Sequence, residues 1–236
     1  SVKRFKPTAA RGADGYAKQD LLYMSPAHVQ NLLQFLMRIE LEGQAWPQQL
    51  TEGIVLALAK HSEAHEAGSY RPIVLFSIIY RCWGSLRSRQ LLRMIESFVH
   101  SDAFGFLPGR EAMQSWLQIQ ASVELSLASG EALSGLAVDF VKAFNHIRRP
   151  QWFALARHLG IPERILQPWH RFLTCFTRRF QVHNHLSAAL TSDIGFAEGD
   201  PLSVPAMAIL DWALHVYQAQ FAPLTRTLSF VDNISM

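Results

Sequence analysis

Three short segments of this chain each contain an aspartate, and two of these aspartates have surroundings that suit metal-dependent chemistry. Asp139 ends the hydrophobic stretch LAVDF, Asp200 lies in the turn sequence EGDPLS, and Asp232 precedes Asn233 in SFVDN. Catalysis by a pair of metal ions uses two divalent cations about 4 Å apart. Such cations prefer oxygen ligands, so at least two carboxylates must converge. Asp139 and Asp232 are the candidates, although an aspartate at the end of a strand is, taken alone, more often a cap or turn residue.

The order of the three segments resembles the reverse transcriptase (RNA-directed DNA polymerase) family, in particular its non-LTR retrotransposon and group II intron branch. The stretch DFVKAFN matches the family's Asp-Phe-x-Lys-Ala-Phe-Asp, with Asn145 at the last position. The resemblance implies that Asp139 is a catalytic metal ligand, with the backbone carbonyl of Phe140 beside it. It also implies that Phe144 lies under the incoming sugar and selects deoxynucleotides; the alternative is an ordinary core aromatic.

The middle segment, GFAEGDPLSVP, matches the family's Gly-x-x-Gln-Gly-Asp-Pro-Leu-Ser-Pro. Glu198 replaces the usual glutamine, and at this nucleotide-binding position a group that only accepts hydrogen bonds adds repulsion. Gly199 would permit the backbone to approach nucleotide, template and primer, which a β-carbon would crowd. Ser203, assigned to template or primer binding, is expected to cap the following helix.

The last segment, FVDN, stands where the family has an aromatic residue, any residue and two aspartates. The resemblance makes Asp232 an essential catalytic metal ligand and places Asn233 at the second aspartate. This change removes one charge near two cations, and each unit charge pair at about 4 Å is worth roughly 4 kcal/mol as an upper bound. The loss either abolishes activity or weakens ion binding and favours Mn²⁺ over Mg²⁺.

Two upstream segments extend the resemblance. Lys60, followed by a polar loop and the sequence YRPI, matches family residues in which this lysine and Arg71 hold the incoming triphosphate. The loop FGFLPGR resembles the family's Gly-Phe-Arg-Pro-Gly-Arg, which lines the template path, and Leu107 replaces one arginine. The resemblance assigns three of its residues to template or primer binding: Phe106, Gly109 and Arg110.

The composition fits a folded protein with an anionic partner but does not require the partner. The 236 residues are 49% hydrophobic and 17% charged, which allows a sizeable core and argues against disorder. The net charge is +3. Cys82 and Cys175 lack the spacing of zinc ligands or of a disulfide scaffold. No secretory signal and no membrane-spanning segment is visible.

Hydrophobic periodicity and turn residues predict the elements that would position these residues. We expect strands over 53–60 and 134–140, and hairpins over 178–196 and 227–236. Helices are expected over the following ranges: 26–43, about 77–99, 111–128, 150–160, 162–172 and 205–220. Over 73–80 helix and strand interpretations compete, with helix favoured from about Ser77.

The expected fold is therefore α+β, with the fingers and palm of a right-hand polymerase, an antiparallel palm sheet and helices packed on one face. We expect a flexible lead-in over 1–24, fingers over 25–130 and a palm over 131–236. Helices and a hairpin of the fingers type would be inserted around 150–195. The thumb would be absent, and the chain would be an excerpt ending just after the catalytic hairpin tip.

The function implied by the resemblance is RNA-directed DNA polymerase activity of a retroelement. Two Mg²⁺ ions, or Mn²⁺, would be the cofactors, and an RNA template, a DNA or RNA primer and dNTPs the partners, with no membrane. The alternative is a catalytically degenerate relic that binds nucleic acid. The site of action would be nuclear in a eukaryote and cytoplasmic in a prokaryote, and the oligomeric state stays open.

Overall fold

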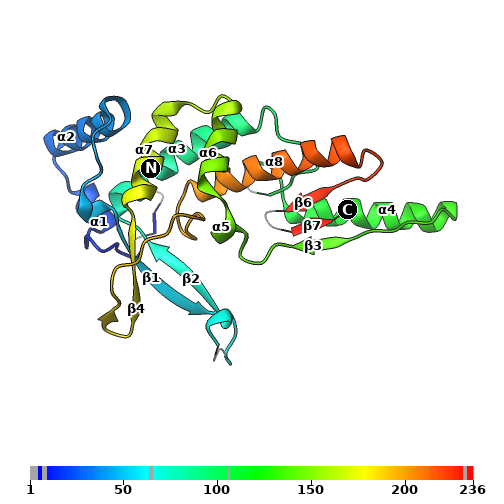
Figure 1. Cartoon of the computed structure of the whole chain (residues 1–236), viewed down its shortest axis with the longest axis horizontal. Helices are drawn as coiled ribbons and strands as arrows, with labels where there is room; N and C mark the ends of the chain where they lie inside the picture. The colour runs from blue at the N-terminus through cyan, green and yellow to red at the C-terminus, as the bar shows by residue number, and fades with distance from the viewer. Residues whose placement is uncertain (1–4, 7–9, 64–65, 106, 231–232, 236) are drawn as a thin grey trace. The chain divides into compact units, whose positions relative to one another are not determined.

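A four-stranded sheet in the order β2-β1-β4-β5 forms from stretches rich in β-branched, aromatic and other apolar residues. Its strands are β1 (Glu52–Ala59), β2 (Tyr70–Leu75), β4 (Thr177–Val182) and β5 (His185–Leu186). Strand β1 pairs antiparallel with β2 and parallel with β4, and β4 and β5 form a hairpin (Figure 1). The parallel strands β1 and β4 are far apart in the sequence, because a parallel pair can be joined only by a long connection.

Helix α2 (Pro26–Met37) begins where the sequence supplies a cap. Ser25 accepts a hydrogen bond from the backbone N–H of His28, and Pro26 occupies the first helical position, as expected for a helix start. The helical elements before β3 are α1 (Lys18–Leu22), α2 (Pro26–Met37), η2 (Arg38–Glu42), η3 (Gln48–Leu50), η4 (Ala67–Ser69), α3 (Ile78–Ile95) and α4 (Ala112–Ser129). Those after it are α5 (Ala143–His146), α6 (Arg149–His158), α7 (Glu163–Cys175) and α8 (Ser203–Phe221). None of the helices in the described part of the chain is long and apolar enough to cross a membrane.

Aromatic side chains fill the core between α3 and α7. The rings of Tyr80 and Phe172 stack with their centroids 3.6 Å apart, and the Trp169 and Phe196 rings stack at 4.6 Å. All four side chains are buried. Because Phe196 lies three residues before Gly199 of the Gly-Asp-Pro turn, this aromatic core anchors the turn to both helices.

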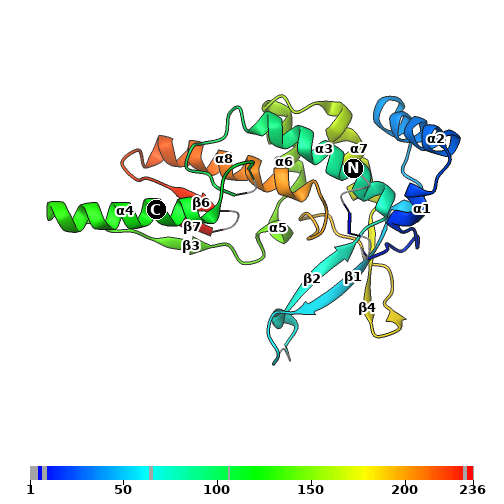
Figure 2. The ribbon, with the colours of Figure 1, turned by 180° about the vertical axis from the view of Figure 1, so that it is seen from behind.

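A second sheet, in the order β3-β7-β6, is antiparallel throughout. Its strands are β3 (Ala137–Asp139), β6 (Leu228–Phe230) and β7 (Asn233–Ser235). Figures 1 and 2 show the three strands side by side. Helix α4 contacts β6, and His215 of α8 is hydrogen-bonded to Ser229 of β6.

The computed structural model describes residues 5–6, 10–63, 66–105, 107–230 and 233–235. It divides into two units, and each unit combines two separate segments of the chain. The first unit contains the residues up to Ser88 together with Phe144–Ser203. The second contains Arg89–Ala143 together with the residues from Val204 onward.

Most of the expected elements are present close to their expected ranges. The strand expected over 53–60 is β1, the hairpin expected over 178–196 contains β4 and β5, and the helix over 111–128 is α4. The segment with competing interpretations divides: residues 70–75 form strand β2, and the helix begins at Ile78. Pairing with β1 explains the strand, because it supplies hydrogen-bond partners for the backbone. Strand β2 lies at the edge of its sheet, where a proline such as Pro72 is tolerated.

Candidate active site

The antiparallel register of the second sheet brings Asp139 to the expected catalytic hairpin. Strand β3 ends at Asp139, strand β7 begins at Asn233, and these two residues are direct partners in the ladder. Direct partners in such a ladder have Cα atoms about 4.5–5.5 Å apart. Asp139 is exposed at the end of its strand. The structure therefore joins the first and last motifs at one end of the sheet, while Asp232 lies outside the described residues.

The oxygen atoms at this end of the sheet suit a hard divalent cation. Asp139 offers a carboxylate, and Phe140, which follows it directly and is 47% exposed, offers a backbone carbonyl. Both are oxygen ligands of the kind that Mg²⁺ prefers. Within the described residues, no cluster of three His, Cys, Asp or Glu side chains could hold a metal ion. The described ligands thus fit one part of a metal site whose expected second carboxylate is Asp232.

The Gly-Asp-Pro turn lies directly against β2. The backbone carbonyl of Glu198 accepts a hydrogen bond from the Val74 N–H at 2.8 Å. Gly199 has a φ of +110°, and a β-carbon there would lie 2.5 Å from the Val74 carbonyl oxygen. The glycine is therefore required by the contact between the turn and the strand, in addition to any contact with nucleic acid.

Two of the expected nucleotide-binding residues meet in an ion pair. The Nε atom of Arg71 lies 3.9 Å from Oε2 of Glu198, and the Arg71 side chain is 65% exposed. Lys60 is also exposed, and its Nζ donates to the Gly68 carbonyl at 3.1 Å. Lys60 directly follows β1, and Arg71 lies in the adjacent strand β2, so both cations lie on one hairpin.

Asp200 is a buried carboxylate to which sequence reasoning gave no role. The Tyr80 hydroxyl lies 3.0 Å from each of its oxygens and donates to them, and the indole N–H of Trp169 donates to Oδ2 at 3.0 Å. The Leu202 N–H donates to Oδ1 at 3.0 Å. Burial raises the pKa of Asp200 to about 6, and the hydrogen bonds partly offset this effect. Burial and the Asp200 charge also raise the pKa of Tyr80.

The sequence gives little signal for this network. Tyr80 and Trp169 lie 120 and 31 positions from Asp200, on different helices. A Gly-Asp-Pro turn in an apolar setting indicates only that the aspartate has some local hydrogen bond. Its side-chain partners depend on how α3 and α7 pack.

The expected role of Ser203 as a helix cap is wrong. Ser203 is the first residue of α8 rather than the residue before it, and its hydroxyl donates to the Ala197 carbonyl at 3.1 Å. The side chain is buried, and its bond closes the turn. Asp200, three residues earlier, accepts the backbone bonds near the helix start, since its carboxylate and carbonyl bind the N–H groups of Leu202 and Ser203.

Phe144 lies on the first unit, whereas Asp139 lies on the second. Its side chain is half-buried, and its backbone carbonyl accepts a hydrogen bond from the Phe196 N–H at 2.8 Å. This contact places Phe144 beside the segment that leads into the Gly-Asp-Pro turn. Lys142, two residues earlier, has a φ of 51°, a left-handed conformation that redirects the chain after β3.

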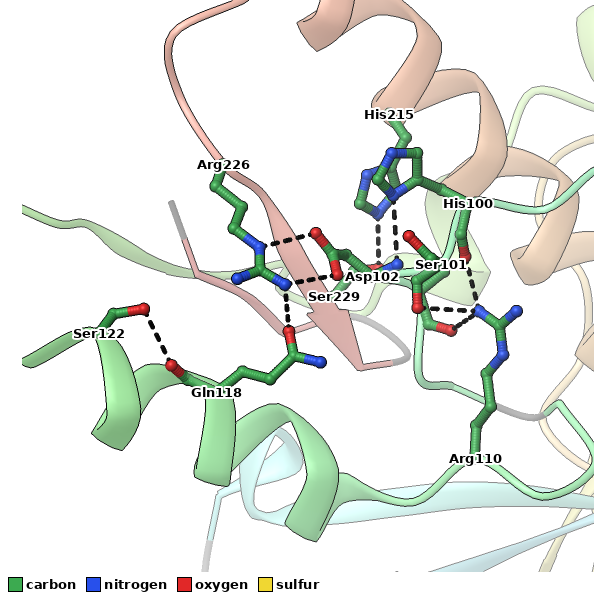
Figure 3. Close-up of polar contacts among 10 residues, drawn as sticks. His100, Ser101, Asp102, Arg110, Gln118, Ser122, His215, Arg226 and Ser229 are labelled. Atoms are coloured by element: carbon green, nitrogen blue, oxygen red, sulfur yellow. Dashed lines mark hydrogen bonds and ion pairs between the residues drawn. The ribbon is translucent and has the colours of Figure 1, made fainter. Parts of the chain in front are cut away.

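The loop expected along the template path is held by Arg110 (Figure 3). Its Nη1 donates to the carbonyls of His100, Ser101 and Ala103 at 2.6, 3.2 and 2.6 Å. Leu107 is buried and belongs to the core of the second unit, which explains an apolar residue there. Gly109 is exposed with a φ of 71°, and Phe106 lies outside the described residues.

The sequence matches the family described as reverse transcriptase (RNA-dependent DNA polymerase) over residues 58–235. The match covers most of the chain, so the protein belongs to the reverse transcriptase family. The comparison with curated proteins gives no match. Members of this family use divalent metal ions, act on nucleic acids and have a fold with fingers and palm.

Proposed function

We propose that this chain is the RNA-directed DNA polymerase domain of a retroelement of the non-LTR or group II intron kind. It extends a DNA or RNA primer with dNTPs along an RNA template, with fingers over 25–130 and a palm over 131–236. The observation that carries the proposal is the ladder pairing of Asp139 with Asn233. This pairing sets the first motif beside the residue that follows Asp232 in the sequence.

In this proposal Asp139, Asp232 and the Phe140 carbonyl hold two divalent cations. When bound, such ions favour deprotonation of the primer 3′-hydroxyl and neutralise charge on the triphosphate. Asn233 supplies a neutral oxygen where the family has a second carboxylate. The lower negative charge would weaken the binding of both ions, so Mn²⁺ should support the reaction better than Mg²⁺.

The incoming nucleotide is bound by side chains of the first unit. Arg71 offers a planar guanidinium that can bind two phosphate oxygens, and Lys60 offers a point charge on the same hairpin. Phe144 contacts the sugar and excludes a 2′-hydroxyl. Glu198 and Gly199 lie at the edge of this site, on the turn that is fixed against β2.

The loop that contains Phe106, Gly109 and Arg110 binds the template and primer, and Ser203 is the further residue assigned to this binding. The exposure of Gly109 supports a close backbone approach to the template. Arg110 fixes the loop through the three backbone carbonyls that it binds.

A second candidate function is nucleic-acid binding without catalysis, as in a degenerate relic. Two observations favour it. Asn233 stands at the ladder position opposite Asp139, which reduces the negative charge at the expected metal site. Glu198 lies beside Arg71, where its carboxylate would compete with a triphosphate for the guanidinium.

Primer extension on an RNA template by the purified protein tests the two functions. The assay is run with Mg²⁺ and with Mn²⁺, beside the variants Asp139→Ala and Asn233→Asp. Extension by the unaltered protein that is lost in Asp139→Ala would establish the polymerase. Extension only by Asn233→Asp would show that asparagine at this one ligand position abolishes the activity of an otherwise intact polymerase. Extension by none of the proteins would favour the relic that binds nucleic acid without catalysis.

A further inference from the structure

The outer edge of strand β6, away from β7, is paired with a loop. Ala103 forms an isolated parallel bridge with Ser229. The Ser229 N–H donates to the Asp102 carbonyl at 3.0 Å, and the Phe104 N–H donates to the Ser229 carbonyl at 2.8 Å. The loop that leads into FGFLPGR therefore continues the second sheet beyond β6.

Side chains reinforce this junction, as Figure 3 shows. Arg226, two residues before β6, binds both carboxylate oxygens of Asp102 through Nε and Nη2, each at 2.8 Å. Its Nη2 also donates to Gln118 of α4. Asp102 is only 8% exposed, and its hydrogen bonds with Arg226 lower its pKa. A bidentate pair of this kind fixes geometry as well as charge.

Helix α8 holds the same strand from another side. The Ser229 hydroxyl donates to Oδ2 of Asp211 at 2.8 Å and lies 3.0 Å from Nε2 of His215. The His215 ring is buried and stacks on His100, with the ring centroids 4.5 Å apart. Ser229 thus makes polar contacts with a loop and a helix at once.

Beside this junction lies a pocket of about 380 Å³, lined in part by His100, His215, Gln218 and Arg226. The lining also includes the apolar residues Ala219, Pro223 and Leu224. Asp102 and Arg226 both line the pocket, so their ion pair lies at its wall.

We propose that Arg226 and Asp102 are positioning residues that hold the β6–β7 hairpin and keep Asn233 in register with Asp139. They also join the hairpin to the loop that contains Arg110, so that the template loop and the metal-binding hairpin form one structural element. This inference rests on the proposed polymerase function for its effect on catalysis. The holding of the hairpin itself is independent of that function.

The variants Arg226→Gln, Asp102→Asn and Arg226→Lys test the inference by hydrogen exchange. In Arg226→Gln and Asp102→Asn we expect the backbone amides of β6 and β7 to exchange about tenfold faster, with β1 and β2 unchanged. Arg226→Lys keeps the charge but loses the bidentate geometry, so it should restore part of the protection. Arg157→Gln is the control, because it breaks the exposed Arg157–Glu163 pair of the first unit.

Primer extension by the same variants tests the catalytic consequence. We expect kcat to fall about tenfold in Arg226→Gln with little change in KM for dNTPs, because no proposed nucleotide-binding residue is altered. Unchanged exchange in β6 and β7 would overturn the inference, and faster exchange with normal kcat would overturn its catalytic consequence. Faster exchange in a protein whose unaltered form extends no primer would support the holding of the hairpin and refute the polymerase function.

Discussion

At the scale of single residues, Asp200 shows how one buried carboxylate holds a motif in place. Its two oxygens accept hydrogen bonds from Tyr80, Trp169 and the Leu202 backbone, which link the turn to α3 and α7. The Gly-Asp-Pro sequence therefore has an internal role: the aspartate faces the core while its neighbours Glu198 and Gly199 face β2.

The titration of Asp200 should make stability depend on pH. Its pKa is raised from the model-peptide value of 3.8 to about 6, so the folded state binds this proton more tightly than the unfolded state. The stability contribution of this group is therefore largest below about pH 4 and falls as the pH rises to about 6, by up to about 3 kcal/mol.

Urea unfolding of the unaltered protein and of Asp200→Asn between about pH 4 and about pH 7 measures this contribution. The asparagine cannot titrate, so the stability advantage of the unaltered protein should shrink as the pH rises. Burial also shifts the pKa values of Asp211 and His215. Both residues are present in both proteins, so their contributions cancel when the two free energies of unfolding are subtracted. Parallel curves for the two proteins would contradict the assignment.

The pair formed by Arg71 and Glu198 leads to a prediction about nucleotide affinity. In the free protein the carboxylate neutralises a guanidinium that we propose binds the triphosphate. Because the arginine of this pair is largely exposed, the ion pair itself is weak. Glu198→Gln should free the guanidinium for the triphosphate and lower KM for dNTPs by about two- to fivefold. The measurement is steady-state primer extension together with calorimetric dNTP binding.

Glu163→Gln serves as the matched control, since it neutralises the acidic partner of another exposed pair, Arg157–Glu163. It should leave KM unchanged. An identical KM in Glu198→Gln and the unaltered protein would show that the carboxylate does not compete with the nucleotide.

At the scale of elements, the decisive contact is that of the turn with β2. Strand β2 is fixed by its register with β1, and its Val74 backbone binds the turn through the Glu198 carbonyl. The position of the turn therefore follows from the sheet, and a change at Gly199 should disturb both.

We predict that Gly199→Ala destabilises the protein by about 3 kcal/mol or more, because its β-carbon would meet the Val74 carbonyl at 2.5 Å. Gly109→Ala is the comparison: its φ is also positive, but no atom lies within 4 Å of the added carbon. That variant should lose only about 1 kcal/mol. Chemical denaturation gives both values, and equal losses would mean that conformation alone, rather than the contact, requires Gly199.

At the scale of the whole molecule, two units each combine two distant segments, so neither unit is a continuous stretch of sequence. The proposed nucleotide-binding residues Lys60, Arg71 and Phe144 lie on the first unit. Asp139 and the loop with Arg110 lie on the second. The division into fingers and palm at residues 130 and 131 stays a prediction.

The basic charge of the whole chain predicts salt-sensitive binding of nucleic acid. With about four phosphate contacts, affinity for a primer–template duplex should fall about 100-fold between about 50 and 200 mM salt. Arg110→Gln, which alters a residue proposed to bind template or primer, should reduce the slope of log affinity against log salt concentration by about one, and Arg157→Gln should not change it. Fluorescence anisotropy provides the measurement, and an affinity independent of salt would exclude phosphate contacts as its source.

The sequence by itself determined the family, the order of the motifs and most helices and strands, because periodicity, caps and turn residues act over a few neighbouring positions. It gave the strand that ends at Asp139 and the hairpin near Asn233. Their pairing was expected from the resemblance, and the register is seen in the structure.

Only the tertiary structure decided which distant side chains meet. The bonds of Asp200 with Tyr80, the pair of Arg71 with Glu198 and the pair of Asp102 with Arg226 join residues on different elements. Such contacts depend on how helices and strands pack, and no local sequence pattern indicates which distant residues will meet. The burial that shifts the pKa of Asp200 has the same origin, since desolvation is a property of the assembled core.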